Sequence, residues 1–192
     1  MQEIQIDIRQ LLTGQPLYNQ HGGILAPMDA VCFTSNGFVK NNGDAVMGRG
    51  TAYIVNEFMR KEGARKLGNA IRANGNVVQV IQEGLPAIVS FPVKPVSRRV
   101  TRIHIDTDIV EHLRAEYENQ VPCTVPGWAC VAEMSIISSS ILGLLRLTDG
   151  MGWSRVALPK PGCGAGELQW ERVKPLLSEW LDERFFVFDR GY

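Results

Sequence analysis

RVALPKPGCGAGELQW, residues 155–170, is the stretch on which the fold depends. It opens with a short apolar run, Val156 to Pro159, which predicts a buried strand. Three glycines then follow at alternate positions (162, 164 and 166), and a predicted amphipathic helix begins at Trp170. Such a turn presents bare backbone N–H groups beside a helix N-terminus, which suits a phosphate. Plain strand-to-helix connections share this pattern, so the stretch alone leaves both interpretations open.

A second stretch upstream has the same organisation. Residues 30–34, AVCFT, form a short apolar run between turn residues and predict a central strand. Residues 42–52, NGDAVMGRGTA, hold Gly48 and Gly50, and apolar residues at helical spacing follow from Thr51. We expect a ligand with two linked phosphates to fit between the two glycine turns.

Predicted strands and helices alternate along the whole chain, without a linker or an internal repeat. Further strands are predicted at 3–8, 77–81, 87–91 and 185–188. Further helices are predicted at 64–73, 108–119, 129–147 and 170–182; residues 13–28 and 121–127 are predicted loops, and 100–105 fit a strand or a loop. This order favours one α/β domain over residues 1–192, with helices on both faces of a mostly parallel sheet. Ligands of such folds bind beyond the carboxyl ends of the strands, where both glycine turns emerge.

Composition and charge exclude several classes of function. The 192 residues suit one domain with a sizeable core, and 20 Lys and Arg residues balance 20 Asp and Glu residues. A net charge of zero argues against binding nucleic acid through bulk charge. A local patch at Arg98, Arg99 and Arg102 stays open beside the alternative of a solvated loop. The most apolar stretch, 128–147, contains charged residues and predicts a buried helix, so no membrane partner is expected.

Cysteine and histidine spacing gives no sign of a metal site. No CxxC pair occurs, and no histidine stands at ligand spacing from a cysteine, so neither a metal nor another cofactor is expected. The residues concerned are Cys32, Cys123, Cys130, Cys163, His21, His104 and His112. A full core needs no disulfides, and the polar N-terminus does not resemble a signal peptide. We therefore expect reduced thiols and a cytoplasmic protein.

Four pieces of the sequence resemble those of macro domains, the ADP-ribose-binding α/β modules. They are TSNG (34–37), NGDAVMGRGTA (42–52), SFPVK (90–94) and LPKPGCGAGELQWERVKPLL (158–177). The resemblance is closest to the branch that includes hydrolases acting on ADP-ribosylated glutamate and on ADP-ribosylated DNA bases. It implies a three-layer α/β/α fold with a mixed six-stranded sheet and ADP-ribose in a cleft at its top. It also implies that residues 106–129 are an insertion, which would cover the cleft or a partner site.

The resemblance implies roles for single residues. Residues 47–51 would face the distal ribose and the diphosphate, and residues 162–168 would cradle the diphosphate. Asn36 would meet the distal ribose, and Asp7 the adenine amino group. The implied ligand-binding residues are Asp7, Asn36, Met47, Gly48, Arg49, Gly50, Thr51, Pro161, Gly162, Cys163, Gly164, Ala165, Gly166, Glu167 and Leu168. Cys163 also fits a reactive thiol at a helix N-terminus, although the family pattern favours a small packing residue.

Lys94 is the candidate catalytic residue, because the resemblance places it where the glutamate- and DNA-acting branch has a lysine tied to catalysis. A neutral amine near the anomeric carbon can open the ribose as a Schiff base, and an ammonium can stabilise developing charge. The first role needs a pKa below the usual value of about 10.4. A strand-end lysine that reaches solvent is the alternative. Gly166 is a departure, because the human glutamate-acting hydrolase carries aspartate there, so its two-residue mechanism is not expected.

Two functions follow from these residues. The first is hydrolysis of an ADP-ribosyl linkage on DNA, on protein or on a small derivative such as ADP-ribose 1''-phosphate. The second is ADP-ribose recognition without chemistry. A dinucleotide-dependent oxidoreductase does not fit, because glycines at 162, 164 and 166 do not match GxGxxG and no second half-fold follows.

Overall fold

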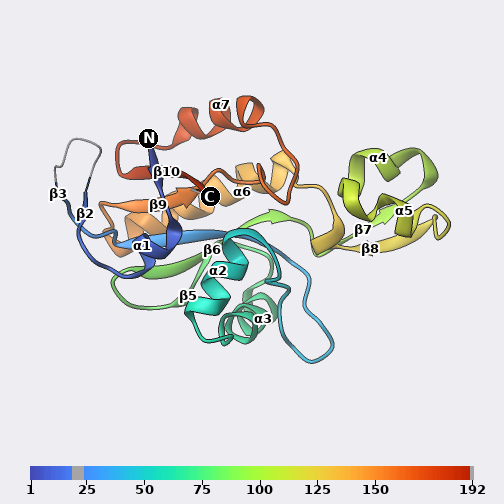
Figure 1. Cartoon of the computed structure of the whole chain (residues 1–192), viewed down its shortest axis with the longest axis horizontal. Coiled ribbons are helices and arrows are strands. Elements are labelled where there is room, and N and C mark those ends of the chain that lie inside the picture. Colours follow the sequence, from blue (N-terminus) through green and yellow to red (C-terminus); the bar gives the residue numbers. More distant parts are fainter. Residues whose placement is uncertain (19–23, 191–192) are drawn as a thin grey trace.

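A six-stranded mixed sheet forms the centre of the computed structural model, which describes residues 1–18 and 24–190 (Figure 1). The strand order is β1-β10-β9-β4-β6-β5. All neighbouring pairs are parallel except β5 and β6, which are antiparallel. The strands are β1 (Gln2–Ile6), β4 (Ala30–Asn36), β5 (Gln79–Gln82), β6 (Ala87–Lys94), β9 (Val156–Pro159) and β10 (Phe185–Arg190). The predicted α/β architecture and sheet are confirmed.

Helices cover both faces of this sheet, and a hydrophobic core lies under each layer. On one face the helices are α1 (Ile8–Leu12), α2 (Gly50–Phe58) and α3 (Gly63–Asn74); on the other they are α6 (Met134–Met151) and α7 (Trp170–Trp180). In β4, Val31 and Phe33 belong to the first core, whereas Ala30 and Cys32 belong to the second. Burial on both faces explains why the central strands are continuous apolar runs. No helix in the described ranges is both long and apolar enough to span a bilayer.

The parallel strands bring the candidate site residues to one edge of the sheet. We call residues 37–49, which follow β4, loop 1, and residues 160–169, which follow β9, loop 2. Lys94 is the last residue of β6 and pairs in register with Asn36, the last residue of β4. Both loops and Lys94 therefore lie at the carboxyl edge, as predicted for a ligand site in such a fold.

Residues 97–130 form a small lobe at one end of the molecule (Figure 1). Strands β7 (Ser97–Val100) and β8 (Cys123–Pro126) pair antiparallel at its base. Short helices connect and follow them: η1 (Arg102–His104), α4 (Ile105–Asp108), η2 (Glu111–Leu113), α5 (Arg114–Tyr117) and η3 (Gly127–Ala129). The lobe has its own core, which includes Val100, Ile109 and Val125. It contains the whole of the stretch 106–129, for which an insertion stays a prediction.

The predicted helix over 108–119 is confirmed only for residues 111–117, which form η2 and α5, and the predicted loop over 121–127 is wrong. Asp108 ends α4 instead of capping a new helix, and its carboxylate accepts a hydrogen bond from Arg98 at 3.1 Å. Ile109 then takes an extended conformation, forms a bridge with Cys130 and is fully buried in the lobe core. Residues 123–126 pair with β7 as β8. Tertiary burial of Ile109 breaks the helical pattern that the sequence suggests locally.

Other boundaries differ by a few residues. The first strand ends at Ile6, because Asp7 caps α1. The predicted loop 13–28 holds the short strands β2 (Leu17–Tyr18) and β3 (Ile24–Leu25), which pair with each other; residues 19–23 lie outside the described ranges. The helix predicted at 129–147 instead spans α6 and ends where Gly152 adopts a left-handed conformation, with φ of 66°.

Candidate functional site

Loop 2 is a compact turn in which two of the three glycines are required by the backbone: Gly162 has a φ of +76°, and Gly166 lies against the Gly162 carbonyl. Its backbone closes through a hydrogen bond from Leu168 N–H to the Gly162 carbonyl at 3.0 Å. A Cβ added at Gly162 would lie 2.9 Å from the Leu168 side chain, and one at Gly166 would lie 2.6 Å from the Gly162 carbonyl oxygen. A Cβ at Gly164 would meet nothing within 4 Å. Gly164 is therefore the glycine of this loop at which a ligand can approach the backbone.

Replacing Gly166 by alanine is expected to destabilise the protein by about 1–3 kcal/mol, because the new methyl group overlaps the backbone of the same loop. Gly164→Ala is the matched control in open space and should change stability by less than about 0.5 kcal/mol. Urea unfolding followed by circular dichroism measures both variants. Equal stability of the two variants would contradict the packing role of Gly166.

Loop 1 and the first residue of α2 present two further open glycines. A Cβ at Gly48 or Gly50 would meet nothing within 4 Å, and Gly50 has a φ of +64°, which favours glycine. Met47 is buried beneath the loop, and Thr51 accepts a hydrogen bond from the Thr34 N–H of β4 at 3.2 Å. Arg49 is exposed beside the two glycines. Loop 1 and the start of α2 thus present exposed backbone and the Arg49 guanidinium. The hydrogen bond between Thr51 and Thr34 fixes this region to β4.

Asn36 shapes loop 1 from beneath. Its side-chain amide donates to the Val46 carbonyl at 3.1 Å and accepts from the Phe38 N–H at 3.0 Å. Both bonds are internal to the protein, so Asn36 positions the loop. A contact between Asn36 and a ribose stays a prediction.

Lys94 is buried rather than solvent-reaching, with 6% of its surface exposed. Its ammonium donates to the carbonyl of Ala165 in loop 2 at 2.7 Å and to that of Trp128 in the lobe at 3.3 Å. Burial lowers the pKa of Lys94 to about 8, and the positive charge of Arg49 acts in the same direction, against Cys130 and Glu167. At pH 7 about a tenth of the Lys94 amine is therefore neutral. The alternative of a strand-end lysine reaching water is wrong.

The tail of loop 2 faces the lobe. Glu167 has a φ of 61°, unusual for a residue other than glycine, and both of its carboxylate oxygens accept from the Glu111 N–H, at 2.9 and 3.1 Å. Leu168 packs against Gly162, and Pro161 is buried. The Glu167 side chain thus hydrogen-bonds the lobe.

The remaining candidates lie at the same edge with internal partners. Asp7 follows β1, caps α1 by accepting from the Arg9 N–H at 2.8 Å and pairs with the Arg9 guanidinium at 3.1 Å. Its contact with adenine stays a prediction. Cys163 packs half-buried against the second core, and burial raises the pKa of its thiol to about 11. A protonated, packed thiol favours the structural role over a reactive one.

Metal ligands do not gather in the described part of the chain. No group of three or more His, Cys, Asp and Glu side chains there could hold an ion, and His21 lies outside it. The four cysteines are free.

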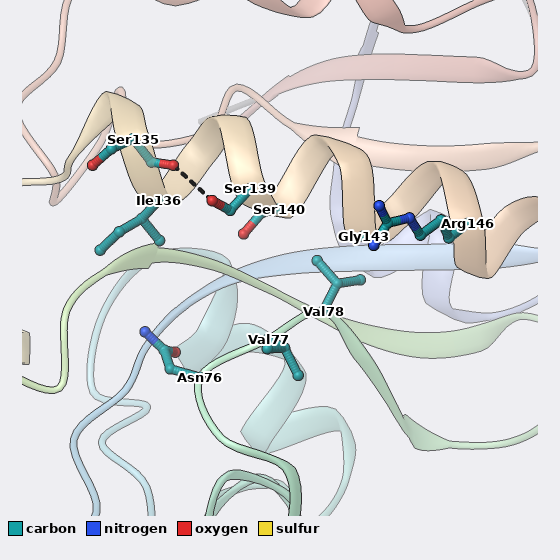
Figure 2. Close-up of a pocket in the computed structure, with 9 residues that line it drawn as sticks. All are labelled: Asn76, Val77, Val78, Ser135, Ile136, Ser139, Ser140, Gly143 and Arg146. Carbon is teal, nitrogen blue, oxygen red and sulfur yellow. Dashed lines mark hydrogen bonds between the residues drawn. The ribbon is translucent and has the colours of Figure 1, made fainter.

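A pocket of about 460 Å³ lies elsewhere, between α6 and the residues leading into β5 (Figure 2). Ser139 and Arg146 of α6 line one side and Val78 the other. Neither glycine loop contributes to it. Asn76 links it to the carboxyl edge, because its amide donates to the Lys94 carbonyl at 3.0 Å. The pocket is therefore distinct from the predicted phosphate site.

Solved structures with the same architecture identify the fold. No protein-family model and no curated protein matches the sequence. The macrodomain of Thermus aquaticus DarG aligns with a TM-score of 0.61 and 17% identity, covering 100% of this chain and 97% of the other. The macrodomain of Mycobacterium tuberculosis DarG gives 0.55 and 18%, covering 85% and 90%. Thermosipho africanus DarTG in complex with ADP-ribose gives 0.55 and 16%, covering 84% and 38%. The chain has the macro domain fold, as the sequence motifs predict.

Proposed function

We propose that this protein binds ADP-ribose between loop 1 and loop 2 and hydrolyses an ADP-ribosyl linkage there. One observation carries the proposal: open glycines from both loops and a buried lysine of lowered pKa meet at the same edge of the sheet. The structural neighbour described as a complex with ADP-ribose supports the choice of ligand.

Binding would rest mainly on backbone N–H groups. Helix α2 begins at Gly50, and no side chain of the described residues caps its N-terminus. Its first N–H groups and its partial positive charge are therefore free for a phosphate. Arg49 adds a full charge beside them, and Gly164 lets the second phosphate reach the backbone of loop 2. A diphosphate between the loops would place an attached ribose toward Lys94.

Lys94 would carry the chemistry. The neutral amine forms a C–N bond to the anomeric carbon while the bond to the leaving group breaks, and the leaving group takes up a proton. The ring C–O bond of the resulting glycosylamine then breaks and the ring oxygen takes up a proton, which gives a Schiff base. Water hydrolyses this Schiff base, which releases ADP-ribose and restores the amine. Gly166 has no room for a carboxylate, so the chemistry does not include a second acid at this position. ADP-ribosylated DNA therefore stays among the substrates, beside modified protein and ADP-ribose 1''-phosphate.

The second candidate function is ADP-ribose recognition without chemistry. The hydrogen bonds from Lys94 to two carbonyls favour it, because a lysine held this way also serves as a structural link between loop 2 and the lobe. Incubation with ADP-ribosylated DNA, glutamate-modified protein and ADP-ribose 1''-phosphate separates the two functions. Release of ADP-ribose from any of them supports the enzyme.

We also propose a cytoplasmic location, which the reduced cysteines suit.

ADP-ribose at 100 times its Kd is expected to raise the melting temperature by about 5–10 °C, because binding to the folded state adds about 2.7 kcal/mol. NAD and ATP at the same concentration should raise it less, since neither ends in a ribose with a free anomeric position next to Lys94. Differential scanning fluorimetry measures the three shifts. Stabilisation by NAD without stabilisation by ADP-ribose would contradict the proposed ligand.

A further inference from the structure

Three consecutive residues of loop 2 are held by other parts of the chain. The Ala165 carbonyl accepts from the Lys94 ammonium at 2.7 Å, and the Gly166 carbonyl accepts from the Ala132 N–H at 2.9 Å. The Glu167 carboxylate accepts from the Glu111 N–H of the lobe at 2.9 and 3.1 Å. The loop tail is thus fixed from β6, from the segment before α6 and from the lobe.

Ion pairs and hydrogen bonds hold the lobe together and join it to the segment before α6 and to loop 2. Arg98 bridges Asp108 of the lobe at 3.1 Å and Glu133, the residue before α6, at 2.8 Å. Arg114 donates from Nε to the Ile109 carbonyl at 3.1 Å, and its guanidinium lies 3.9 Å from the Glu167 carboxylate. The second carbonyl that holds Lys94, at Trp128, also belongs to the lobe. The ammonium of Lys94 therefore sits where the lobe and loop 2 meet.

The backbone of Glu167 adopts an unfavourable, left-handed conformation. A φ of 61° is unfavourable for a residue other than glycine and persists where the surroundings impose it. Here the carboxylate contact with the lobe supplies that constraint, because a charged acceptor on a backbone N–H forms a stronger hydrogen bond than a neutral one.

We propose that Glu167 is a positioning residue that clasps loop 2 to the lobe and so keeps the Lys94 amine between the carbonyls of Ala165 and Trp128. The proposal rests on the proposed function for the use of that amine. Opening the clasp frees the Ala165 carbonyl to move, which exposes the amine. The groups that act on the charge of Lys94 are consistent with this role, because Glu167 and Cys130 favour its ammonium form while Arg49 opposes it.

Two substitutions at Glu167 separate contact from folding. Glu167→Gly removes the carboxylate and suits the left-handed backbone, so the loop can retain its fold. Glu167→Gln keeps an oxygen that can accept from the Glu111 N–H. Glu118→Gly, an exposed glutamate of the lobe, is the matched control.

Acylation of Lys94 by acetic anhydride at pH 8, followed by mass spectrometry, measures access to the amine. Glu167→Gly is expected to raise the labelling rate of Lys94 about 10-fold, the effect of losing one charge-assisted hydrogen bond. Glu167→Gln should stay within about threefold of the original protein, and Glu118→Gly should not differ from it. Lys174, half exposed on α7, serves as the internal reference for reagent concentration.

An unchanged Lys94 labelling rate in Glu167→Gly, or an equal rise in Glu118→Gly, would overturn the clasp. If the labelling rate of Lys94 rose as much in Glu167→Gln as in Glu167→Gly, the hydrogen bond from the Glu111 N–H to the Glu167 side chain would not be what limits access to the amine. None of these readouts needs ADP-ribose. A failure of ADP-ribose to stabilise the protein therefore rejects the proposed function without deciding the clasp, and the labelling rates decide the clasp without deciding the function.

Discussion

Gly164→Val is expected to lower the affinity for ADP-ribose by on the order of 100-fold while the protein stays folded. A Cβ at Gly164 would point into open space, with no protein atom within 4 Å. It would stand where a phosphate must approach the backbone of loop 2. Isothermal titration calorimetry measures the affinity, and circular dichroism checks the fold.

Gly150→Val is the matched control for this prediction. A Cβ at Gly150 also meets nothing within 4 Å. Gly150 lies near the end of the 18-residue helix α6, which is about 27 Å long and begins near loop 2. The same volume added there should leave ADP-ribose affinity unchanged. If Gly164→Val retained its affinity for ADP-ribose, the proposed contact between the diphosphate and loop 2 would be wrong.

The central fold could be predicted from the sequence because its signals are local and strong. The runs at 30–34 and 156–159 are short, apolar and bounded by turns, and both are buried strands. The glycine turns after them emerge at the same edge. The sequence could not distinguish the three glycines of loop 2, because packing requirements appear only when Leu168 and Gly162 are in contact.

The local sequence pattern predicts the structure of the lobe less well than that of the central sheet. Asp108 and Glu111 match a capping box, but Arg98 takes the Asp108 carboxylate and Glu167 takes the Glu111 N–H. Both partners are distant in the sequence, by 10 and 56 positions. Such contacts override the local helical preference, and no pattern within the segment reveals them.

The sequence predicts the candidate site only through its side chains and glycines, and the backbone partners of these side chains appear only in the structure. The motif identifies Lys94, whereas the partners of its buried ammonium are the backbone carbonyls of Ala165 and Trp128. Any residue type supplies a carbonyl, so these partners leave no signal in the sequence. For Asn36 the sequence likewise gives no sign that its amide hydrogen-bonds Val46 and Phe38 of loop 1, and its contact with a ribose stays a prediction.

Lys94→Gln is expected to reduce release of ADP-ribose by roughly 1,000-fold while ADP-ribose binds within about threefold of the original affinity. Glutamine keeps an N–H donor on a slightly shorter side chain, but it has no nucleophilic amine. Lys174→Ala, a lysine of α7 paired with Glu3, is the control and should retain full turnover. Single-turnover assays measure release, and calorimetry measures binding.

The pH dependence decides which form of Lys94 acts. With a pKa of about 8, the neutral amine falls about tenfold for each pH unit below that value. If the amine is the nucleophile, the rate of release rises with pH and levels off above about 8, and Lys94→Arg stays inactive. A rate that instead falls as pH rises through 8, with activity restored in Lys94→Arg, would make Lys94 a cation that stabilises charge. Unchanged turnover in Lys94→Gln would remove the lysine from the chemistry, and would leave its two carbonyl bonds as a link between loop 2 and the lobe.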